Sequence, residues 1–297
     1  MILVTGASGY IGQGFLAAMH AQEQTVMLAG RDYVSAKHTR EFDLERPETF
    51  EPALRGVSTI VHLAGLGHGL VERESDYLRV NAEAVKHWMS VAAKNGVTRF
   101  ILLSSMNIVP TSASDPAQSA ASYPEPTDAY SASKWHAELA LEQAFSDTPC
   151  LGLIVRAALT YDRELHANLA SLQRWVKFSP VALPQAGART MVARSDLAAL
   201  LRYLVITPEH AFSRRIWAAT DGEIYDSRRI GAALGAGSLP LPETLWWLVA
   251  QCRDGFTRRG FGTTWSSLSG TRWAGKTTPL PEWSPTTSLE ACLGVGP

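Results

Sequence analysis

The sequence predicts an α/β fold, a doubly wound parallel sheet with a smaller, less regular C-terminal domain. In the first half, short aliphatic or β-branched runs alternate with longer segments of helical periodicity, which is typical of parallel strands joined by covering helices. After residue 156 this alternation fades, and proline and glycine become frequent from residue 231 onward. We therefore expect residues 1–160 to form the sheet domain, with later segments returning to it, and residues 161–297 to form mainly the smaller domain.

The strands are predicted from short, continuous apolar runs, because strands buried on both faces lack the alternation of half-buried strands. The helices follow from apolar positions three and four residues apart, and Gly96 suits the end of one of them. The expected strands are 2–5, 25–29, 59–63, 100–104 and 151–156, and the expected helices are 12–21, 77–95, 129–145, 168–177 and 196–206.

Composition excludes several classes of protein. The 27 Lys and Arg residues balance 28 Asp and Glu residues, so the charge gives no reason to expect a nucleic acid as partner. Cys150, Cys252 and Cys292 are widely spaced, which predicts reduced thiols in a cytoplasmic protein and neither disulfides nor a metal site. The chain has no run of 18 apolar residues, so we expect no membrane span.

A glycine-rich turn, residues 5–12, follows the first expected strand. Gly6 permits a tight turn, Gly9 lets the backbone approach a diphosphate, and Gly12 lets helix and strand pack closely. The diphosphate then binds N–H groups at the positive end of the following helix. The turn therefore predicts a Rossmann-type dinucleotide site, with contacts at Gly6, Ser8, Gly9, Tyr10, Ile11 and Gly12.

The end of the second strand bears on which dinucleotide binds. An acidic residue there suits the ribose 2′-hydroxyl, whereas an arginine suits a 2′-phosphate. Gly30 stands where the carboxylate is expected, and Arg31 follows it. Arg31 therefore favours NADP(H), and NAD(H) is the alternative if Asp32 holds the ribose.

Tyr130 and Lys134 lie four residues apart, on one face of the expected helix 129–145. A cation near a phenol favours the phenolate, so we expect Lys134 to lower the pKa of Tyr130 and also to contact the cofactor ribose. Ser105 follows the strand 100–104, at the edge of the sheet where ligands bind. Ser105, Tyr130 and Lys134 are therefore the predicted catalytic residues of a carbonyl–alcohol redox reaction.

With these motifs the chain resembles the extended short-chain dehydrogenase/reductase family, in its NAD(P)-dependent epimerase/dehydratase branch, over nearly its whole length. The segment 62–65 is similar to the family segment that lines the cofactor. The resemblance also implies a homodimer that pairs through the helices 77–95 and 129–145. The further cofactor contacts that it implies are Asp43, Leu44, Leu63, Ala64, Gly65 and Asn81.

The second half resembles, around Asn168 and Arg189, bacterial surface-polysaccharide enzymes that act at carbon 4 of UDP-N-acetylhexosamines. This resemblance implies that both residues hold the diphosphate of a nucleotide-sugar substrate, in a C-terminal substrate-binding domain. A guanidinium suits that task because its planar fork matches phosphate oxygens. Met106 and Asn107 stand where related 4,6-dehydratases carry an Asp-Glu pair, which argues against dehydration and leaves Asn107 as a candidate substrate contact.

Four functions are compatible with these motifs. We favour slightly an NADPH-dependent 4-ketoreductase of a UDP-hexose, because Gly30 and Arg31 do not supply the acidic residue of NAD-retaining enzymes. A nucleotide-sugar 4-epimerase with retained NAD is the first alternative. A reductase of a non-sugar carbonyl and a catalytically silent dinucleotide sensor are the others, and the second of these conflicts with the retained Tyr130 and Lys134.

Overall fold

The computed structural model describes residues 1–21, 26–31, 38–67, 73–177, 179–212, 214–256, 263–275 and 283–295. The chain forms two compact units. The first unit contains residues Met1–Val109, Asp115–Ala157 and Leu197–Ala219. The second unit contains residues Pro110–Ser114, Ala158–Asp196 and Thr220–Pro297.

The first unit is built on a seven-stranded sheet of order β3-β2-β1-β4-β5-β6-β9, in which every neighbouring pair is parallel. The predicted fold class is therefore confirmed. The order reverses between β1 and β4, which is where ligands bind in such sheets. The strands are β1 (Ile2–Thr5), β2 (Val26–Gly30), β3 (Thr39–Glu41), β4 (Thr59–His62), β5 (Arg99–Ser105), β6 (Leu151–Ala157) and β9 (Ile216–Ala219).

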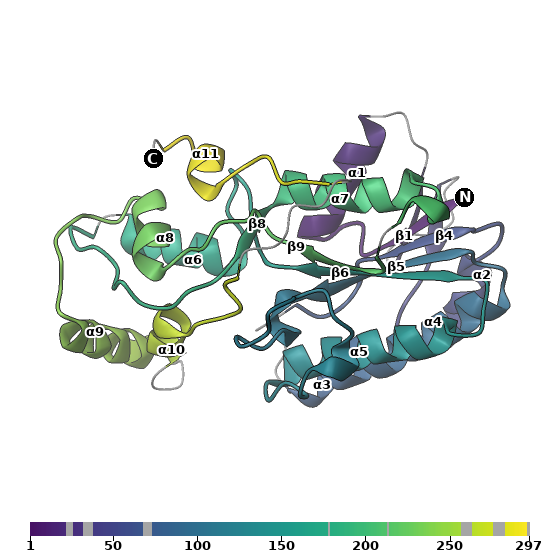
Figure 1. The fold of residues 1–297 in the computed structure, drawn as a ribbon, viewed down its shortest axis with the longest axis horizontal. Coiled ribbons are helices and arrows are strands. Elements are labelled where there is room, and N and C mark those ends of the chain that lie inside the picture. The colour runs from purple at the N-terminus through teal and green to yellow at the C-terminus, as the bar shows by residue number, and fades with distance from the viewer. Residues whose placement is uncertain are drawn as a thin grey trace. The chain divides into compact units, whose positions relative to one another are not determined.

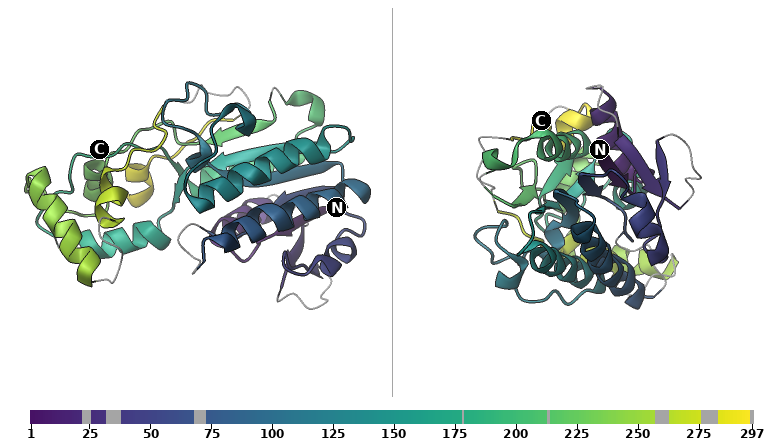
Figure 2. Two further views of the ribbon diagram at one scale, coloured as in Figure 1. Left: turned by 90° about the horizontal axis from the view of Figure 1, so that it is seen from below. Right: turned by 90° about the vertical axis from the view of Figure 1, so that its right-hand side faces the viewer.

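Helices cover both faces of this sheet. On one face lie α1 (Tyr10–His20) and α7 (Arg194–Ile206), and on the other lie α4 (Val85–Lys94) and α5 (Ala129–Phe145) (Figure 1). The pair α4 and α5 run side by side (Figure 2, left). The remaining turns of this unit are η1 (Pro47–Thr49), α2 (Phe50–Ala53), α3 (Ser75–Tyr77), η2 (Leu78–Ala84), η3 (Met106–Ile108), η4 (Ala120–Ser122) and η5 (Glu209–Ala211).

The core explains why these segments become strands and helices. Strand β5 is buried along most of its length, which accounts for its continuous apolar run. Trp88 of α4 and Phe100 of β5 are both fully buried in the same core cluster. The predicted helix 77–95 is a continuous helical segment, but its part Leu78–Ala84 has π-helical hydrogen bonding. Helix α4 ends before Gly96, which adopts φ +75° as a terminating glycine does.

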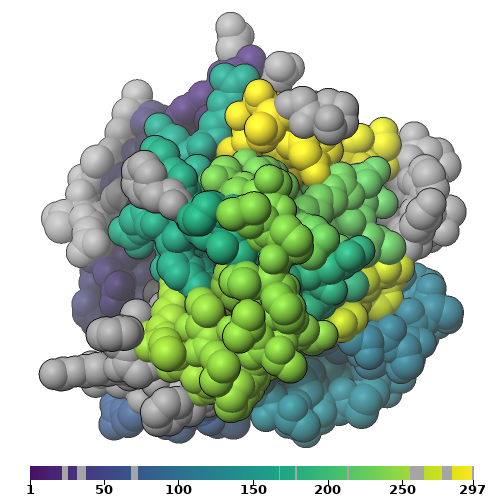
Figure 3. All heavy atoms as spheres, turned by 90° about the vertical axis from the view of Figure 1, so that its left-hand side faces the viewer, coloured from purple at the N-terminus to yellow at the C-terminus, as the bar shows by residue number. Residues whose placement is uncertain are grey.

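The second unit has its own core around a two-stranded parallel sheet of β7 (Leu159–Tyr161) and β8 (Met191–Ala193). Trp246 of α9 is buried in this core, whereas Trp247 and Leu248 of the same helix are exposed; Figure 3 shows the side on which α9 lies. In the described part of the chain, no helix is long and apolar enough to cross a membrane. Its helices are α6 (Ala167–Val176), α8 (Ser227–Ala233), α9 (Glu243–Phe256), α10 (Thr263–Ser269) and α11 (Leu289–Leu293).

Candidate active site

The glycine turn after β1 has no room for side chains. Gly6 adopts φ +70°, and a Cβ on it would lie 2.5 Å from the backbone nitrogen of Ala64. A Cβ on Gly12 would lie 2.3 Å from the carbonyl oxygen of Gly6. Gly9 is the N-cap of α1 and supplies no side chain to its first N–H groups. These N–H groups are therefore available to an anion, so the turn fits the diphosphate of a dinucleotide.

A hydrogen-bonded contact joins the glycine turn to the end of β4. Thr5 Oγ1 lies 2.8 Å from Nδ1 of His62 and accepts a 3.3 Å hydrogen bond from the backbone nitrogen of Ala64. His62 is buried, and burial together with the charge of Lys134 lowers its pKa to about 3. The imidazole is therefore neutral at physiological pH, and it fixes the segment of Leu63, Ala64 and Gly65 beside Gly6.

Asn81 holds the loop after β4 against α5. Its Oδ1 accepts a 2.8 Å bond from the backbone nitrogen of Leu66, and its Nδ2 donates to Leu66 O at 3.0 Å and to Ser133 Oγ at 3.3 Å. A Cβ on Gly65 would lie 2.8 Å from Asn81 Oδ1, so the loop fits closely against the amide. Asn81 lies in the π-helical turn of η2, a distortion that is common at functional sites. The structure gives Asn81 the role of shaping the site.

The structure brings the three predicted catalytic residues together at the carboxyl end of β5. Helix α5 begins where Asp128 accepts a 2.9 Å hydrogen bond from the backbone nitrogen of Ser131, which places Tyr130 in its first turn. Lys134 Nζ donates to Leu103 O at 3.2 Å. Ser105 Oγ accepts from the backbone nitrogen of Asn107 at 3.2 Å and hydrogen-bonds Tyr130.

The ring of Tyr130 packs against Tyr77. The two centroids are 5.5 Å apart in an edge-to-face arrangement, and Tyr77 Oη donates to Gly67 O at 3.0 Å. Tyr77 thus links the phenol to the loop after β4. The sequence did not single out Tyr77, and its place in the expected helix 77–95 gave only the general signal of a core-facing aromatic residue.

The electrostatics of this trio correct one expectation. Burial raises the pKa of Tyr130 to about 12, although the hydrogen bond from Ser105 lowers it. Burial also lowers the pKa of Lys134 to about 8, and the charge of Glu138 opposes that change. The prediction that Lys134 lowers the pKa of Tyr130 in the protein itself is therefore wrong, because desolvation of the phenolate outweighs the neighbouring cation.

The cofactor-site residues farther along the sheet are more exposed. Arg31 lies exposed at the end of β2, beside Gly30, which pairs with Glu41 of β3. Asp32, the alternative partner of the ribose, lies outside the described residues. Asp43 is partly buried, and its Oδ1 accepts a 3.0 Å hydrogen bond from the backbone nitrogen of Glu45. Leu44 is buried, and Ser8, Tyr10 and Ile11 border the glycine turn, with Ser8 exposed.

Asn168 and Arg189 both belong to the second unit. Asn168 is exposed in the first turn of α6. Arg189 Nη2 donates to Ser267 O at 2.8 Å and to Gly270 O at 3.2 Å, whereas its buried Nε has no partner among the described residues. Burial lowers the pKa of Arg189, and the nearby charge of Arg272 lowers it further. Two guanidinium groups thus lie near each other, which is an arrangement that suits an anion.

One buried ion pair was not anticipated. Glu138 of α5 and Arg156 of β6 form a salt bridge of 2.6 Å, and both side chains are fully buried. The sequence contained a signal for it, since Glu138 follows Lys134 by four residues and shares its helix face. The partner of Glu138 comes from another element, however, and helix periodicity alone does not reveal it.

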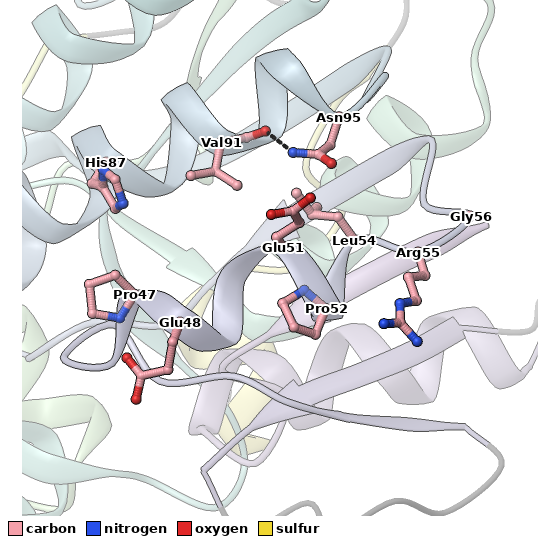
Figure 4. A pocket seen from close by; sticks show the side chains of 10 residues that line it. All are labelled: Pro47, Glu48, Glu51, Pro52, Leu54, Arg55, Gly56, His87, Val91 and Asn95. Atoms are coloured by element: carbon pink, nitrogen blue, oxygen red, sulfur yellow. Dashed lines mark hydrogen bonds between the residues drawn. The ribbon is translucent and has the colours of Figure 1, made fainter.

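A surface groove elsewhere in the first unit contains none of the predicted site residues (Figure 4). It runs between α2 and α4, and Asn95 Nδ2 donates to Val91 O at 2.9 Å along one wall. No cluster of three potential metal ligands occurs within the described ranges. The groove is lined by Pro47, Glu48, Glu51, Pro52, Leu54, Arg55, Gly56, His87, Val91 and Asn95.

Comparison with known proteins bears on the family. Residues 2–164 match the model of a family described as the NAD dependent epimerase/dehydratase family. A UDP-glucose 4-epimerase of Vibrio cholerae is 26% identical over 263 residues, which cover 82% of this chain and 79% of that protein.

Two further similarities agree with that match. An N-acetyl-alpha-D-glucosaminyl-diphospho-ditrans,octacis-undecaprenol 4-epimerase of Escherichia coli O157:H7 is 24% identical over 208 residues, covering 68% of this chain and 62% of that protein. The structure of the UDP-glucose 4-epimerase of Thermus thermophilus, in complex with NAD, has a TM-score of 0.73 at 16% identity and covers 99% and 97% of the two chains. This last similarity concerns the fold alone.

Proposed function

Since the chain belongs to the NAD dependent epimerase/dehydratase family, within the extended short-chain dehydrogenases/reductases, we propose that it is a 4-epimerase of a nucleotide-activated hexose. The observation that carries the proposal is the convergence of Ser105, Tyr130 and Lys134 beside a glycine turn shaped for a diphosphate. Two relatives with distinct substrates, one a UDP-sugar and one a lipid-linked sugar, are both named as 4-epimerases. This agreement favours epimerisation over the reductase that the sequence alone favoured slightly.

Each residue of the trio has a role in this reaction. A bound nicotinamide dinucleotide supplies the hydride acceptor in the first half-reaction and the hydride donor in the second. Tyr130 Oη accepts the proton of the sugar 4-hydroxyl as the hydride leaves carbon 4, and returns that proton after the keto sugar has presented its other face. Ser105 Oγ hydrogen-bonds the reacting oxygen. The ammonium of Lys134 stabilises the phenolate that Tyr130 becomes.

In the second unit, Arg189 supports a diphosphate-containing substrate. Its Nε is buried without a partner among the described residues, and Arg272 adds a second positive charge nearby. A buried donor without an acceptor is costly, so a bound phosphate oxygen would satisfy it. We propose that Arg189 and Arg272 hold the diphosphate and that Asn168 contributes from the exposed first turn of α6. Asn107, next to Ser105, is the proposed contact to the sugar.

One observation favours a second function. Gly30 and the exposed Arg31 end β2 without a carboxylate of their own, which suits the 2′-phosphate of NADPH. An NADPH-dependent 4-ketoreductase would use the same trio in one direction only, with Tyr130 donating its proton to the 4-keto oxygen. The two functions therefore differ in the cofactor and in whether it is retained.

The discriminating experiment starts with the purified protein and no added cofactor. The dinucleotide released by denaturation is identified, and conversion is then measured for UDP-glucose, UDP-N-acetylglucosamine, the lipid-diphosphate-linked N-acetylglucosamine and the 4-keto sugars. A 4-epimerase retains NAD and interconverts a sugar with its 4-epimer without net cofactor consumption. Stoichiometric oxidation of exchangeable NADPH by a 4-keto sugar would establish the reductase. Dinucleotide binding without any turnover, equal in wild type and Tyr130→Phe, would refute both.

We also propose a homodimer that pairs through the helical segment from Ser75 to Lys94 and through α5. Light scattering behind a sizing column tests this directly. A mass near twice 32.3 kDa is expected, and a monomer at micromolar concentration would contradict it.

A further inference from the structure

Glu138 is held from two strands and lies one helical turn beyond Lys134 on α5. Arg156 Nη2 donates to its Oε2 at 2.6 Å, and Arg156 Nε donates to its Oε1 at 3.1 Å. Ser104 Oγ, at the end of β5, also donates to Oε1. This two-pronged contact with a guanidinium is the geometry of a carboxylate. Glu138 thus ties α5 to the carboxyl ends of both β5 and β6.

Arg156 is satisfied on its remaining side. Its Nη1 donates to Pro116 O at 2.7 Å, and its guanidinium lies over the ring of Tyr123 with 5.3 Å to the centroid. A fully buried ion pair stabilises little by itself, because desolvation of both charges offsets their attraction. An apolar pair of similar size would pack at least as well. This pair therefore invites an explanation in terms of the adjacent site.

The charges around Lys134 indicate that explanation. Lys134 is faced by Tyr130 and Glu138 on its own helix and by His62 on β4. His62 is neutral, so Glu138 is the anion that acts on the ammonium. Glu138 itself is faced by Arg156 of β6 and Glu142 of α5. Burial lowers the pKa of Lys134 to about 8, and Glu138 limits that decrease.

We propose that Glu138, held by Arg156 and Ser104, is a positioning residue for the redox pair: it fixes α5 against the end of β5 and keeps Lys134 in the ammonium form. The first part sets the spacing between Lys134 and Ser105, since Ser105 directly follows the residue that Glu138 binds. The clause on the redox pair rests on the proposed function, whereas the effect on the ionisation of Lys134 does not.

The test is a ¹³C NMR titration of lysine side chains without substrate. The chain has only six lysines, so the Lys134 resonance can be assigned by its loss in Lys134→Met. Glu138→Gln keeps the shape and removes the charge. The double variant Glu138→Gln with Arg156→Met also removes the unpaired guanidinium, so that it folds even if the single variant does not. Glu142→Gln is the matched control, because Glu142 binds Ser119 and lies one turn farther along α5.

We expect Lys134 of the wild type to titrate near pH 8. Its midpoint should fall by roughly half a pH unit or more in both Glu138 variants and stay unchanged in Glu142→Gln. The alkaline limb of kcat/KM should shift by the same amount. A wild-type midpoint in the double variant would overturn the inference. Failure of both Glu138 variants to fold would also overturn it, by making Glu138 a stability element. Absence of turnover in a wild type that titrates as expected would instead refute the proposed function alone.

Discussion

The buried imidazole of His62 should make the protein lose stability as the pH falls. Its ring is 1% exposed, Thr5 occupies Nδ1, and Nε2 has no partner among the described residues. Its pKa is about 3 in the folded chain, against 6.5 as the ordinary value. Below pH 6.5 the unfolded chain therefore binds a proton that the folded chain does not. The stability contributed by the neutral ring is complete above pH 6.5 and is lost progressively between pH 6.5 and 3.

The size of the effect follows from the gap between these two values. Each pH unit inside that window costs about 1.4 kcal/mol for one group. At pH 5 the window has been entered by about 1.5 units, so the loss relative to pH 7 is about 2 kcal/mol. The variant His62→Asn keeps a polar atom toward Thr5 and removes the titration, so its unfolding free energy should depend less steeply on pH.

The assay is urea unfolding at several values between pH 7 and pH 5, for wild type, His62→Asn and His20→Asn. The last variant replaces an exposed imidazole at the end of α1 and controls for the loss of a histidine as such. Wild type and His20→Asn should lose stability in parallel, with His62→Asn losing about 2 kcal/mol less. Equal slopes for wild type and His62→Asn would refute the reasoning, whatever the stabilities at pH 7.

Three other predictions concern the site. Tyr130→Phe should lower kcat by roughly 10²- to 10⁴-fold in steady-state assays while the dinucleotide Kd, from calorimetry, changes by less than about threefold; unchanged turnover would exclude Tyr130 as the acid–base group. Gly12→Ala should weaken dinucleotide binding about tenfold or more, because its Cβ would lie 2.3 Å from Gly6 O, whereas Gly9→Ala, at 3.2 Å from the same oxygen, should bind more tightly than Gly12→Ala; the reverse order would contradict the fit of the turn. Arg189→Ala should raise KM for the sugar nucleotide roughly tenfold or more with little change in kcat, and an unchanged KM would remove Arg189 from the diphosphate site.

The sheet was largely predictable because its central strands are buried on both faces and therefore read as continuous apolar runs. Two edge strands escaped prediction for different reasons. β3 (Thr39–Glu41) is short and polar, and only its pairing with β2 makes it a strand. β9 (Ile216–Ala219) is fully buried, but its four residues stand in a region without regular alternation. Short edge strands depend on a neighbour for their hydrogen bonds, and that neighbour is not visible in local sequence.

The candidate site was predictable where its chemistry depends on spacing along one element. The four-residue step from Tyr130 to Lys134 places both side chains on one face of α5 wherever that helix lies. The contacts of Asn81 with Leu66 and Ser133 depend instead on how three segments meet, and the π-helical turn around Asn81 has no signature in the sequence. A sequence therefore reveals intrahelical partners before it reveals partners from other elements.

Burial was the quantity that sequence could not supply, and it changes how the site works. Without bound cofactor, Tyr130 is a phenol with a pKa of about 12, and Lys134 has a pKa of about 8. At neutral pH the phenol is therefore a poor base until additional positive charge lies beside it. The nicotinamide cation is such a charge when it is bound in its oxidised form. Proton abstraction by Tyr130 is thereby coupled to the presence of the hydride acceptor, which prevents the base from acting on a sugar that cannot be oxidised.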